Sequence, residues 1–532
     1  MSTTSPGAGS WLEQMGPLRR QVLQAAFVAA LVAIGANALL YACKSASPLI
    51  GADGWYFVGS IVRKAAEGNL TFGDLFAKRS AFDHSQPLRK LVLLFHYRVF
   101  DLDFGVEAIV GVLAAFANLG LVWGIMRPAT RSQNPAVAAC VFAALAAVYL
   151  SLNASVVFDW SLLTLAYTGH AFVLCFFLAC WWAFTGTTPG RLALLAIAAF
   201  AMDVVVDDTG LVATLAAALA VAAAAARDRR WSRGIRVVAT VLAAYAAYLL
   251  LWRWISTPAP TGDGAQPGLG SLLGLLWERA GHASAALLAP FSAGIAHPMQ
   301  MRPMFGRATG AAGVAVALVV LVAHAWFWWC AWNGKRNRVA FVATGLMFMF
   351  YGLVVGILVV RGSRYGLDYL WQPRYVVIYQ WNIVALLMMG ASQLPVAEAP
   401  STPRSAGWHA LLACVAIALL LLQLPLSRHS WSGARYRSAN QQRTALSLGT
   451  MARRAMRGEA DPSSVDAECQ LQPQCKSEVV RFLKANRLNV FSPAFQARNR
   501  LYPDARALPR WRPKSVRGGV QHLVQPVVQP HP

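Results

Sequence analysis

The sequence predicts an all-α integral membrane protein with about eleven transmembrane helices, and two observations lead to this prediction. Hydrophobic residues make up 57% of the 532-residue chain and charged residues only 13%, a balance that is not found in ordinary soluble domains. Apolar runs of roughly 18 residues or more, each long enough to cross about 30 Å of hydrocarbon as a helix, recur along most of the chain.

The predicted spans follow one another from near the N-terminus. The first comes after Arg19 and Arg20, and its apolar part is longer than that of a signal peptide, so we interpret it as a membrane anchor. The fifth and sixth are short and are expected to form a hairpin. The spans cover residues 21–42, 105–126, 135–152, 161–184, 191–205, 209–226, 236–256, 309–332, 339–360, 375–394 and 408–426.

The distribution of positive residues among the loops predicts which side of the membrane each loop occupies. Arginine and lysine gather in short loops, for example at residues 227–233 and 335–338, and the positive-inside rule places such loops in the cytoplasm. Residues 1–20 are then cytoplasmic, and the tail, residues 427–532, is periplasmic. The transmembrane domain, residues 21–426, carries outer loops at residues 43–104, 257–308 and 361–374.

Composition also narrows the partners. A formal net charge of +24 would suggest nucleic acid for a soluble protein, but here the positive residues lie between spans and in the tail. The surface of an anionic membrane is therefore the expected partner, and no nucleic acid is predicted. The chain has no Walker loop, dinucleotide fingerprint, Gly-x-Ser-x-Gly or His-Glu-x-x-His motif, which excludes the common soluble nucleotide chemistries.

Two of the eight cysteines, Cys469 and Cys475, stand in a polar region. No histidine or further cysteine accompanies them, so a zinc site lacks ligands and a small disulfide loop is the better interpretation. A disulfide there places the tail in an oxidising compartment.

The first outer loop is predicted to contain two amphipathic helices that lie in the membrane interface. Residues 55–69 place aromatic and aliphatic side chains on one face, opposite Arg63 and Lys64. Residues 88–100 follow a helix-starting proline, with Leu91 and Phe95 on the apolar face and Arg89, Lys90 and Arg98 on the polar one.

Two further segments have weaker patterns. Residues 271–296 are moderately apolar but interrupted by charges, and they are expected to be re-entrant or interfacial rather than spanning. In the tail we expect a helix over residues 476–486, an extended segment over 488–493, and a disordered end rich in proline and arginine.

Two aspartates in the first outer loop are the candidate catalytic residues. Asp53 lies about ten residues past the first span among aromatic residues, and Asp83 follows in the same loop. A carboxylate at a partly desolvated interface serves as a general base that takes a proton from a hydroxyl nucleophile. Asp53 also fits as the N-cap of a helix that starts near Trp55, and the two roles are compatible.

His84, next to Asp83, is a candidate binding residue that shares a proton or a metal ion with it. A plain hydrogen bond to the aspartate is the commoner fate of such a histidine. Metal binding by Asp53, Asp83 and His84 needs a further oxygen ligand that the sequence does not identify. No metal site is predicted, and a divalent cofactor stays open.

The outer loop at residues 361–375 combines three arginines with several aromatic residues. Guanidinium groups bind phosphate oxygens with two hydrogen bonds, and aromatic faces stack on sugars, so a phosphate-bearing lipid fits here. Arg374 directly precedes the tenth span, with Tyr375 beside it and Arg364 near in sequence. The alternative is an aromatic belt whose arginines reach toward lipid headgroups.

Other polar residues near or within spans have simpler explanations. Asp208 and Asp159 are expected to cap helices, whereas Asp203 and Asp207 are candidates to line a cavity. His170 and His324 lie within spans, where an ionisable group is either functional or hydrogen bonded to a neighbouring helix. These six residues thus do not decide the function.

Together these features resemble the GT-C class of membrane glycosyltransferases. The resemblance rests on an acidic residue soon after the first span, two interfacial helices in the first outer loop, about eleven spans and an outer C-terminal part. Three segments are similar to stretches in bacterial members linked to surface polysaccharides: residues 82–91, 371–375 and 488–491. The likeness covers most of the chain as architecture, and its motifs are short.

The resemblance implies an enzyme of the bacterial inner membrane that moves a sugar from a polyprenyl-phosphate carrier, usually with inversion, to a glycan or lipid acceptor on the outer face. Asp53 then matches the catalytic carboxylate of the first outer loop, helped by Asp83. Arg364 and Arg374 match the basic residues that hold the carrier phosphate. The chain departs from the best-known members at Gly54, where those carry a second acidic residue.

Two other functions fit the same features. A transporter or flippase of a lipid-linked saccharide also needs arginines and an amphipathic cavity, although no repeat relates the two halves of this chain. A noncatalytic membrane protein of an envelope-assembly complex is the third.

Overall fold

The computed structural model describes residues 16–78, 84–130, 135–160, 166–207, 209–256, 269–278, 280–394, 403–459 and 475–504. Within these ranges the chain forms helices, turns and short connections, and no strand. Eleven of the described helices are long and apolar enough to cross a membrane. The prediction of an all-α polytopic membrane protein is confirmed.

Each of these helices overlaps one predicted span. Several are continued by a short turn of another helix type. In chain order they are α2 (Pro17–Ser45), α7 (Phe104–Thr130), α8 (Pro135–Tyr149) with η2 (Leu152–Ala154) and α9 (Ser155–Asp159), α11 (Ala166–Thr185), α12 (Pro189–Val206), α13 (Thr209–Asp228), α14 (Trp231–Ile255), α17 (Pro298–Phe305) with α18 (Thr309–Asn333), α19 (Arg338–Ile357) with η4 (Leu358–Gly362) and α20 (Ser363–Tyr365), η6 (Pro373–Tyr375) with α21 (Val376–Ser392), and α22 (Pro403–Met456).

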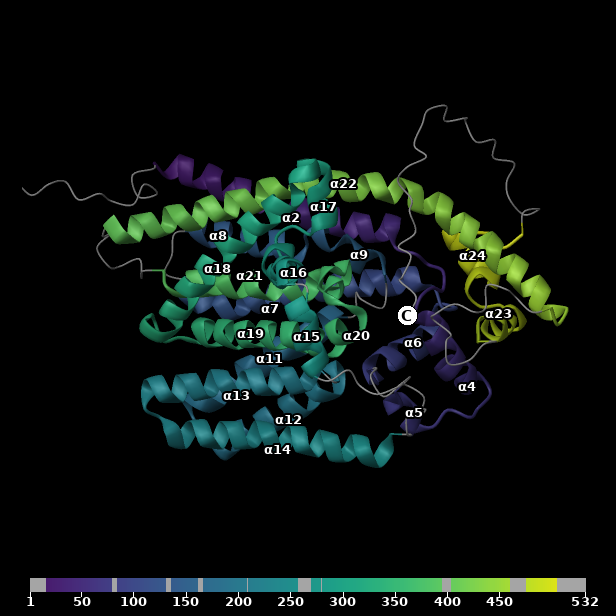
Figure 1. The fold of residues 1–532 in the computed structure, drawn as a ribbon, viewed down its shortest axis with the longest axis horizontal. Helices are drawn as coiled ribbons and strands as arrows, with labels where there is room; N and C mark the ends of the chain where they lie inside the picture. Colours follow the sequence, from purple (N-terminus) through teal and green to yellow (C-terminus); the bar gives the residue numbers. More distant parts are fainter. Residues whose placement is uncertain are drawn as a thin grey trace, which may run out of the picture.

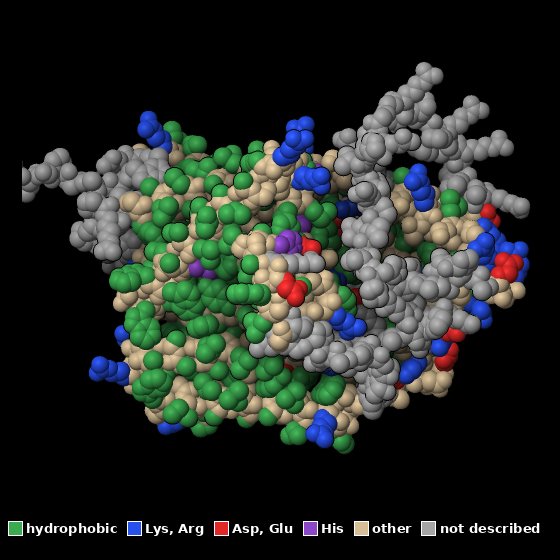
Figure 2. All heavy atoms as spheres, viewed as in Figure 1, with side chains coloured by type: hydrophobic (Ala, Val, Ile, Leu, Met, Phe, Trp, Pro, Cys, Tyr) green, Lys and Arg blue, Asp and Glu red, His purple; other side chains and the backbone are tan. Residues whose placement is uncertain are grey.

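The spanning helices lie side by side in one bundle (Figure 1). Helices α8 and α21 are the most enclosed, whereas α12, α14 and α18 keep most of their surface on the outside. Hydrophobic side chains cover the visible face of the bundle (Figure 2). A hydrophobic surface of this extent is suited to contact with lipid.

At one end of the bundle, arginine side chains donate hydrogen bonds to backbone carbonyl oxygens of neighbouring helices. Arg227, at the end of α13, donates to the carbonyl oxygens of Ala331 and Gly334. Arg338, at the start of α19, donates to the carbonyl oxygens of Ile125 and Gly124. Ala331 is among the last carbonyl groups of α18, which lack partners within the helix, and the Gly124 carbonyl lacks a helical donor because Pro128 has no amide hydrogen. The predicted cytoplasmic loops thus hold neighbouring helices together.

The described parts of loop one (residues 46–78 and 84–103) and residues 475–504 pack into one small unit, called the cap here, at the opposite end of the bundle (Figure 1). The end of α22 belongs to it as well. Its other helices are α3 (Gly54–Phe57), η1 (Val58–Val62), α4 (Arg63–Ala66), α5 (Phe72–Phe76), α6 (Pro87–Val99), α23 (Cys475–Ala485), η9 (Asn489–Phe491) and α24 (Pro493–Asn499).

The first predicted amphipathic helix forms as α3, η1 and α4 in succession. Its apolar face, with Trp55 and Val58, is buried in a core shared with Leu448 of α22 and Val479 and Leu483 of α23. The amphipathic pattern of this helix is therefore explained by packing within the cap.

The second amphipathic helix, α6, exposes its apolar face and buries part of its polar face, the reverse of the first. Its apolar residues Leu91, Phe95 and Val99 are 50%, 56% and 53% exposed, whereas Arg89 and Lys90 are buried. The exposed apolar stripe suits an interfacial helix, as predicted. The interpretation of Arg89 and Lys90 as the solvated face was wrong, because both side chains find partners inside the cap. The Lys90 ammonium donates to the carbonyl oxygens of residues 74, 75 and 77, at the end of α5.

Helix α22 does not end near residue 426, where the predicted span ends, but runs on to Met456. Residues 427–456 contain no proline, so nothing in the sequence breaks the helix. The extension brings Arg437 and Gln441 to the junction between bundle and cap, and it places Leu448 and Ala452 in the core of the cap.

The segment expected to be re-entrant or interfacial forms two helices, α15 (Leu269–Glu278) and α16 (Ala280–Ala293). At 10 and 14 residues, both are shorter than the roughly 20 residues that a span needs. Helix α16 packs against α18 and α21 and against η5 (Leu367–Trp371). In the tail, α23 covers the predicted helix, while η9 replaces the middle of the predicted extended segment.

Candidate functional site

A small hollow lies where loop one leaves the bundle. Its volume is about 250 Å³. It is lined by Ser47, Leu49, Gly51, Ala52, Phe104, Asp159 and Trp160. Asp53, the predicted base, follows Ala52 directly in the chain. The hollow therefore combines backbone and apolar groups of loop one with one carboxylate from the bundle, Asp159.

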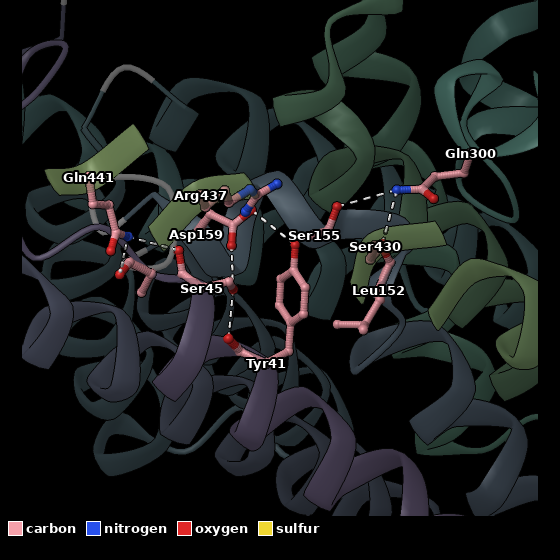
Figure 3. Close-up of polar contacts among 10 residues, drawn as sticks. Tyr41, Ser45, Leu152, Ser155, Asp159, Gln300, Ser430, Arg437 and Gln441 are labelled. Carbon is pink, nitrogen blue, oxygen red and sulfur yellow. Dashed lines mark hydrogen bonds and ion pairs between the residues drawn. The ribbon is translucent and has the colours of Figure 1, made fainter. Parts of the chain in front are cut away.

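Asp159, the last residue of α9, is held in place by three side chains (Figure 3). The Ser45 hydroxyl donates to its Oδ1 at 2.6 Å, and the Tyr41 hydroxyl donates to its Oδ2 at 3.2 Å. Arg437 forms an ion pair with the same carboxylate and lies over the Tyr41 ring, 5.8 Å from its centroid. These contacts fix the carboxylate as a charged acceptor. Asp159 was expected to cap the fourth span, but residues 161–165 lie outside the described ranges, so that role stays a prediction.

Polar contacts along α22 hold this arrangement together (Figure 3). Gln441 donates to the carbonyl oxygens of Ser45 and Ala46, at the end of α2. Nearer the N-terminus of α22, the Ser430 hydroxyl donates to the carbonyl oxygen of Leu152 at 3.0 Å and accepts from the Gln300 side-chain amide at 3.2 Å. Helix α22 thereby joins α2 and the η2–α9 segment beside the hollow.

Asp53 stands at the start of α3, half-buried, on a tight turn. The amide of Gly54 donates to the carbonyl oxygen of Gly51, and Ala52 has a φ of 46° in the left-handed region. That conformation costs a residue with a side chain about 1 kcal/mol. The Asp53 side chain makes no capping hydrogen bond to α3. Helix capping therefore does not explain this carboxylate.

A buried arginine acts on Asp53 from α6. Burial lowers the pKa of Arg89 to about 9, and the negative charge of Asp53 opposes that shift. Arg89 was not predicted as a site residue. No sequence signal marks Arg89, because a charged residue on the polar face of an amphipathic helix usually contacts water.

Asp83 lies outside the described residues, while His84 is half-buried at the start of the next described stretch. The residue after it, Ser85, is anchored to Asp207 through its backbone amide and its hydroxyl. The Tyr248 hydroxyl donates to Asp207 as well, at 2.7 Å. Asp207 thus ties loop one to α14.

The remaining polar residues that were considered near or within spans have the following surroundings. Asp203 is fully buried within α12, and Asp208 lies outside the described residues. His324 lies 2.7 Å from the Tyr351 hydroxyl, which fits the hydrogen-bonding interpretation. The His170 ring packs on Trp381, with centroids 4.3 Å apart.

The arginine-rich loop forms a cluster of cations on tyrosine rings. The Arg374 guanidinium lies 5.1 Å from the Tyr369 centroid and 5.4 Å from that of Tyr375, and it donates to the Tyr369 hydroxyl. Arg364 is exposed and lies over Tyr365. Arg361, which was not singled out, interacts electrostatically with Tyr375. The structure therefore brings Arg361 and Arg374 to one tyrosine.

Two donors in this loop are buried without an acceptor in the described part of the chain, Arg374 Nε and Trp371 Nε1. Buried donors are normally hydrogen bonded, so such a pair indicates that an external acceptor belongs there. The backbone of the loop is itself held by two side chains. The Tyr379 hydroxyl donates to the carbonyl oxygen of Leu370 at 2.8 Å, and Nε2 of His297 lies 2.9 Å from the carbonyl oxygen of Trp371.

Helix α9 connects the hollow with the arginine-rich loop. The turn η6, which contains Arg374 and Tyr375, packs against α9, and α9 ends at Asp159 in the wall of the hollow. Ala52, which precedes Asp53 in the chain, lines the same hollow from loop one. Neither Asp53 nor Arg374 is itself among the residues that line it.

No group of three or more His, Cys, Asp or Glu side chains in the described ranges is arranged to hold a metal ion. Cys469 and the side chain of Cys475 lie outside what the structure describes, so the disulfide stays a prediction.

Comparisons with protein-family models, with curated proteins and with solved structures gave no match to this chain.

Proposed function

We propose that this protein is a GT-C-like glycosyltransferase of the bacterial inner membrane, which moves one sugar from a polyprenyl phosphate to a glycan or lipid acceptor on the outer face. The observation that carries the proposal is that α9, which ends at Asp159 in the wall of the hollow, packs against the turn that contains Arg374, while Ala52, next to Asp53 in the chain, lines the same hollow. A carboxylate pair and an arginine cluster at one membrane surface are the groups that this reaction needs.

The hollow suits a sugar ring. Its volume of about 250 Å³ is below the roughly 300–1,000 Å³ of sites for drug-sized ligands, which favours a single sugar over a chain of them. Phe104 and Trp160 offer aromatic surface for the apolar face of a ring, and Asp159 offers an acceptor for its hydroxyl groups.

The arginine loop suits the carrier phosphate. The free Nε of Arg374 and Nε1 of Trp371 are donors without acceptors in the described structure, and phosphate oxygens are strong acceptors. Arg361 adds a second positive charge beside Tyr375. These charges stabilise the phosphate as it becomes the leaving group.

The reaction then proceeds in one displacement. The acceptor hydroxyl oxygen forms a bond to the anomeric carbon as the bond from that carbon to the phosphate oxygen breaks, and Asp53 takes the hydroxyl proton. The polyprenyl phosphate leaves with the bonding electron pair. Asp159 is held by three partners and orients the sugar, and Asp53, which follows Ala52 of the hollow's wall in the chain, is the base.

The test is a donor panel. Purified protein in vesicles is given polyprenyl phosphates that carry different radiolabelled monosaccharides, together with extracted outer-face glycolipids as acceptors. We expect label to move to acceptor, with release of polyprenyl phosphate, for at least one donor. Movement of intact donor between leaflets with no transfer would instead support a flippase. Absence of both activities would leave a noncatalytic role and would overturn the proposal.

A further inference from the structure

His297 joins three elements that lie between the hollow and the arginine-rich loop. It is the N-cap residue of α17 and is 2% exposed. Its backbone amide donates to Oδ1 of Asn153 in η2 at 2.6 Å, and its ring Nε2 lies 2.9 Å from the carbonyl oxygen of Trp371 in η5. The turn η2 leads directly into α9, which ends at Asp159 in the wall of the hollow. A short series of hydrogen bonds therefore connects this wall with the arginine-rich loop.

The two ring nitrogens of His297 have different backbone partners, and these partners define its tautomer. Nδ1 accepts from the backbone amide of Met299 at 3.3 Å, so it carries no proton. The carbonyl oxygen of Trp371 can only accept, so Nε2 carries the proton and donates it. The ring is therefore neutral, and both of its polar atoms are used.

A helix cap alone does not require a histidine. Serine, threonine, aspartate and asparagine are the preferred N-cap residues, and each accepts from the first helical turn with a short side chain. Histidine adds a donor on the other side of the ring, and in His297 this donor is the atom that contacts the Trp371 carbonyl. The residue type is therefore explained by the contact with the arginine-rich loop and not by the cap.

The histidine is itself held from η2 and α16. Asn153 is 3% exposed, and its side-chain amide donates to the carbonyl oxygen of Ala293, the last residue of α16, at 2.8 Å. In α17, the Gln300 side-chain amide donates to the Ser155 hydroxyl, at the start of α9, at 3.3 Å (Figure 3). Contacts from two residues, His297 and Gln300, thus fix α17 to the η2–α9 segment.

The carbonyl that His297 holds belongs to a residue with an unsatisfied donor. Trp371 Nε1 and Arg374 Nε are buried and have no acceptor in the described ranges. The carbonyl oxygen before it, that of Leu370, accepts from the Tyr379 hydroxyl. With both carbonyls held, the backbone of Trp371 is fixed, and so is the direction in which its indole leaves the chain. A loop that is already ordered loses less conformational entropy when a ligand binds, which raises affinity.

We propose that His297 is a positioning residue for the carrier phosphate, an inference that rests on the proposed function. Through Nε2 it keeps the arginine-rich loop in its binding conformation before the phosphate arrives, so that Trp371 Nε1 and Arg374 Nε are ready to donate. Asn153 holds His297 and thereby keeps the loop at a constant distance from α9 and the hollow.

Two substitutions separate the cap from the contact with the loop. His297→Asn places an oxygen where Nδ1 was and so keeps the cap, but it has no atom that reaches the Trp371 carbonyl. His297→Gln places an amide nitrogen where Nε2 was and so keeps the donor to that carbonyl. The control is His282→Asn, because His282 contacts the same loop at Asp368, where the two side chains are 42% and 75% exposed.

The first measurement is the affinity for polyprenyl phosphate without sugar, by displacement of a fluorescent analogue. We expect His297→Asn to bind about tenfold more weakly than wild type, to show a similar rise in KM for donor, and to keep its kcat and thermal midpoint. His297→Gln and His282→Asn keep the wild-type affinity. Wild-type affinity in His297→Asn would overturn the inference. An equal loss in His297→Gln would overturn it too, because the donor to Trp371 would then not be what matters.

A second measurement needs no substrate. The amides of Gln372 and Tyr375 donate to carbonyl oxygens within the loop, and hydrogen–deuterium exchange followed by mass spectrometry reports how often these bonds open. We expect faster exchange of both amides in His297→Asn and the wild-type rate in His297→Gln, with α17 unchanged in His297→Asn. Equal exchange of the loop in all proteins would overturn the inference. Faster exchange together with a wild-type protein that binds no polyprenyl phosphate would instead overturn the proposed function and the phosphate role of the loop, and would leave its anchoring by His297 standing.

Discussion

Arg437 of α22 pairs with Asp159 at the end of α9, and this contact ties the helix that enters the cap to the wall of the hollow. The two residues are far apart in sequence, so the pair exists only in the folded protein. It also turns the Asp159 carboxylate toward Tyr41 and Ser45, which donate the remaining hydrogen bonds.

Replacing Asp159 by Asn is expected to lower both stability and activity. The change removes the ion pair and leaves Arg437 without its acceptor, a loss of about 2 kcal/mol. Thermal unfolding of the detergent-solubilised protein measures the first effect, and the donor-panel assay measures the second. Ser45→Ala is the milder control, because it removes one donor and keeps the charges. If Asp159→Asn behaves as wild type in both assays, Asp159 does not organise the hollow.

Asn489 is expected to control how firmly loop one is held. Its side-chain amide donates to the carbonyl oxygens of Pro48 and Leu102, near the two ends of the loop, at 3.0 and 2.7 Å. Asn489→Ala removes two buried hydrogen bonds, although the Pro48 carbonyl still accepts from the Phe104 amide, and we expect a cost of about 2 kcal/mol. We expect faster proteolysis within loop one. The control is Asn486→Ala, whose amide contacts only its own helix. Equal cleavage rates for the two variants would contradict this role.

Arg374 is expected to matter more for phosphate binding than Arg364. Arg374 is half-buried between two tyrosines, whereas Arg364 is exposed and therefore well solvated. A charge-assisted hydrogen bond contributes about 1.5–3 kcal/mol, which corresponds to roughly a tenfold to hundredfold loss of affinity in Arg374→Gln. Binding of polyprenyl phosphate without sugar, measured by displacement of a fluorescent analogue, checks this. A larger loss in Arg364→Gln would reverse the assignment.

His96 is expected to make the cap less stable in mild acid. Its pKa falls from the ordinary 6.5 to about 4, first because of burial and then because of Arg89. The unfolded chain takes up a proton below pH 6.5 and the folded chain does not, so stability is lost as the pH falls from 6.5 toward 4. Between pH 7 and pH 5 the loss is about 2 kcal/mol.

The comparison that checks this uses unfolding of wild type and His96→Gln at pH 7 and pH 5. The variant cannot take up the proton, so its loss over that interval should be smaller by the amount that His96 contributes. An identical loss in both proteins would show that His96 does not cause the acid sensitivity.

The spans were predictable because each signal is local. A run of apolar residues needs no knowledge of its neighbours to be recognised, and all eleven described spanning helices overlap a predicted one. The helix of residues 54–66 was predictable for the same reason, although the partner of its apolar face was not.

The orientation of α6 was not predictable by the same rule. Hydrophobic periodicity assigns charged residues to water, but Arg89 and Lys90 are buried because carbonyl groups of α5 and the carboxylate of Glu107 receive them. Those acceptors come from other parts of the chain. A single sequence holds no record of such pairs.

The candidate site shows the same division. Asp53 and Arg374 were chosen from local context, a carboxylate after a span and an arginine before one. Asp159 was assigned to capping, since its partners Tyr41, Ser45 and Arg437 come from α2 and α22. His297 was passed over for the same reason, because its partners lie in η2 and η5.

The most direct test of the central claim is the rate of sugar transfer by Asp53→Asn at saturating donor, relative to wild type and to Asp368→Asn. Asp368 is an exposed carboxylate of the arginine loop and serves as the control. The account predicts that Asp53→Asn binds donor as wild type does but transfers sugar at least about 100-fold more slowly, while Asp368→Asn keeps the wild-type rate. Transfer by Asp53→Asn at the wild-type rate would contradict it.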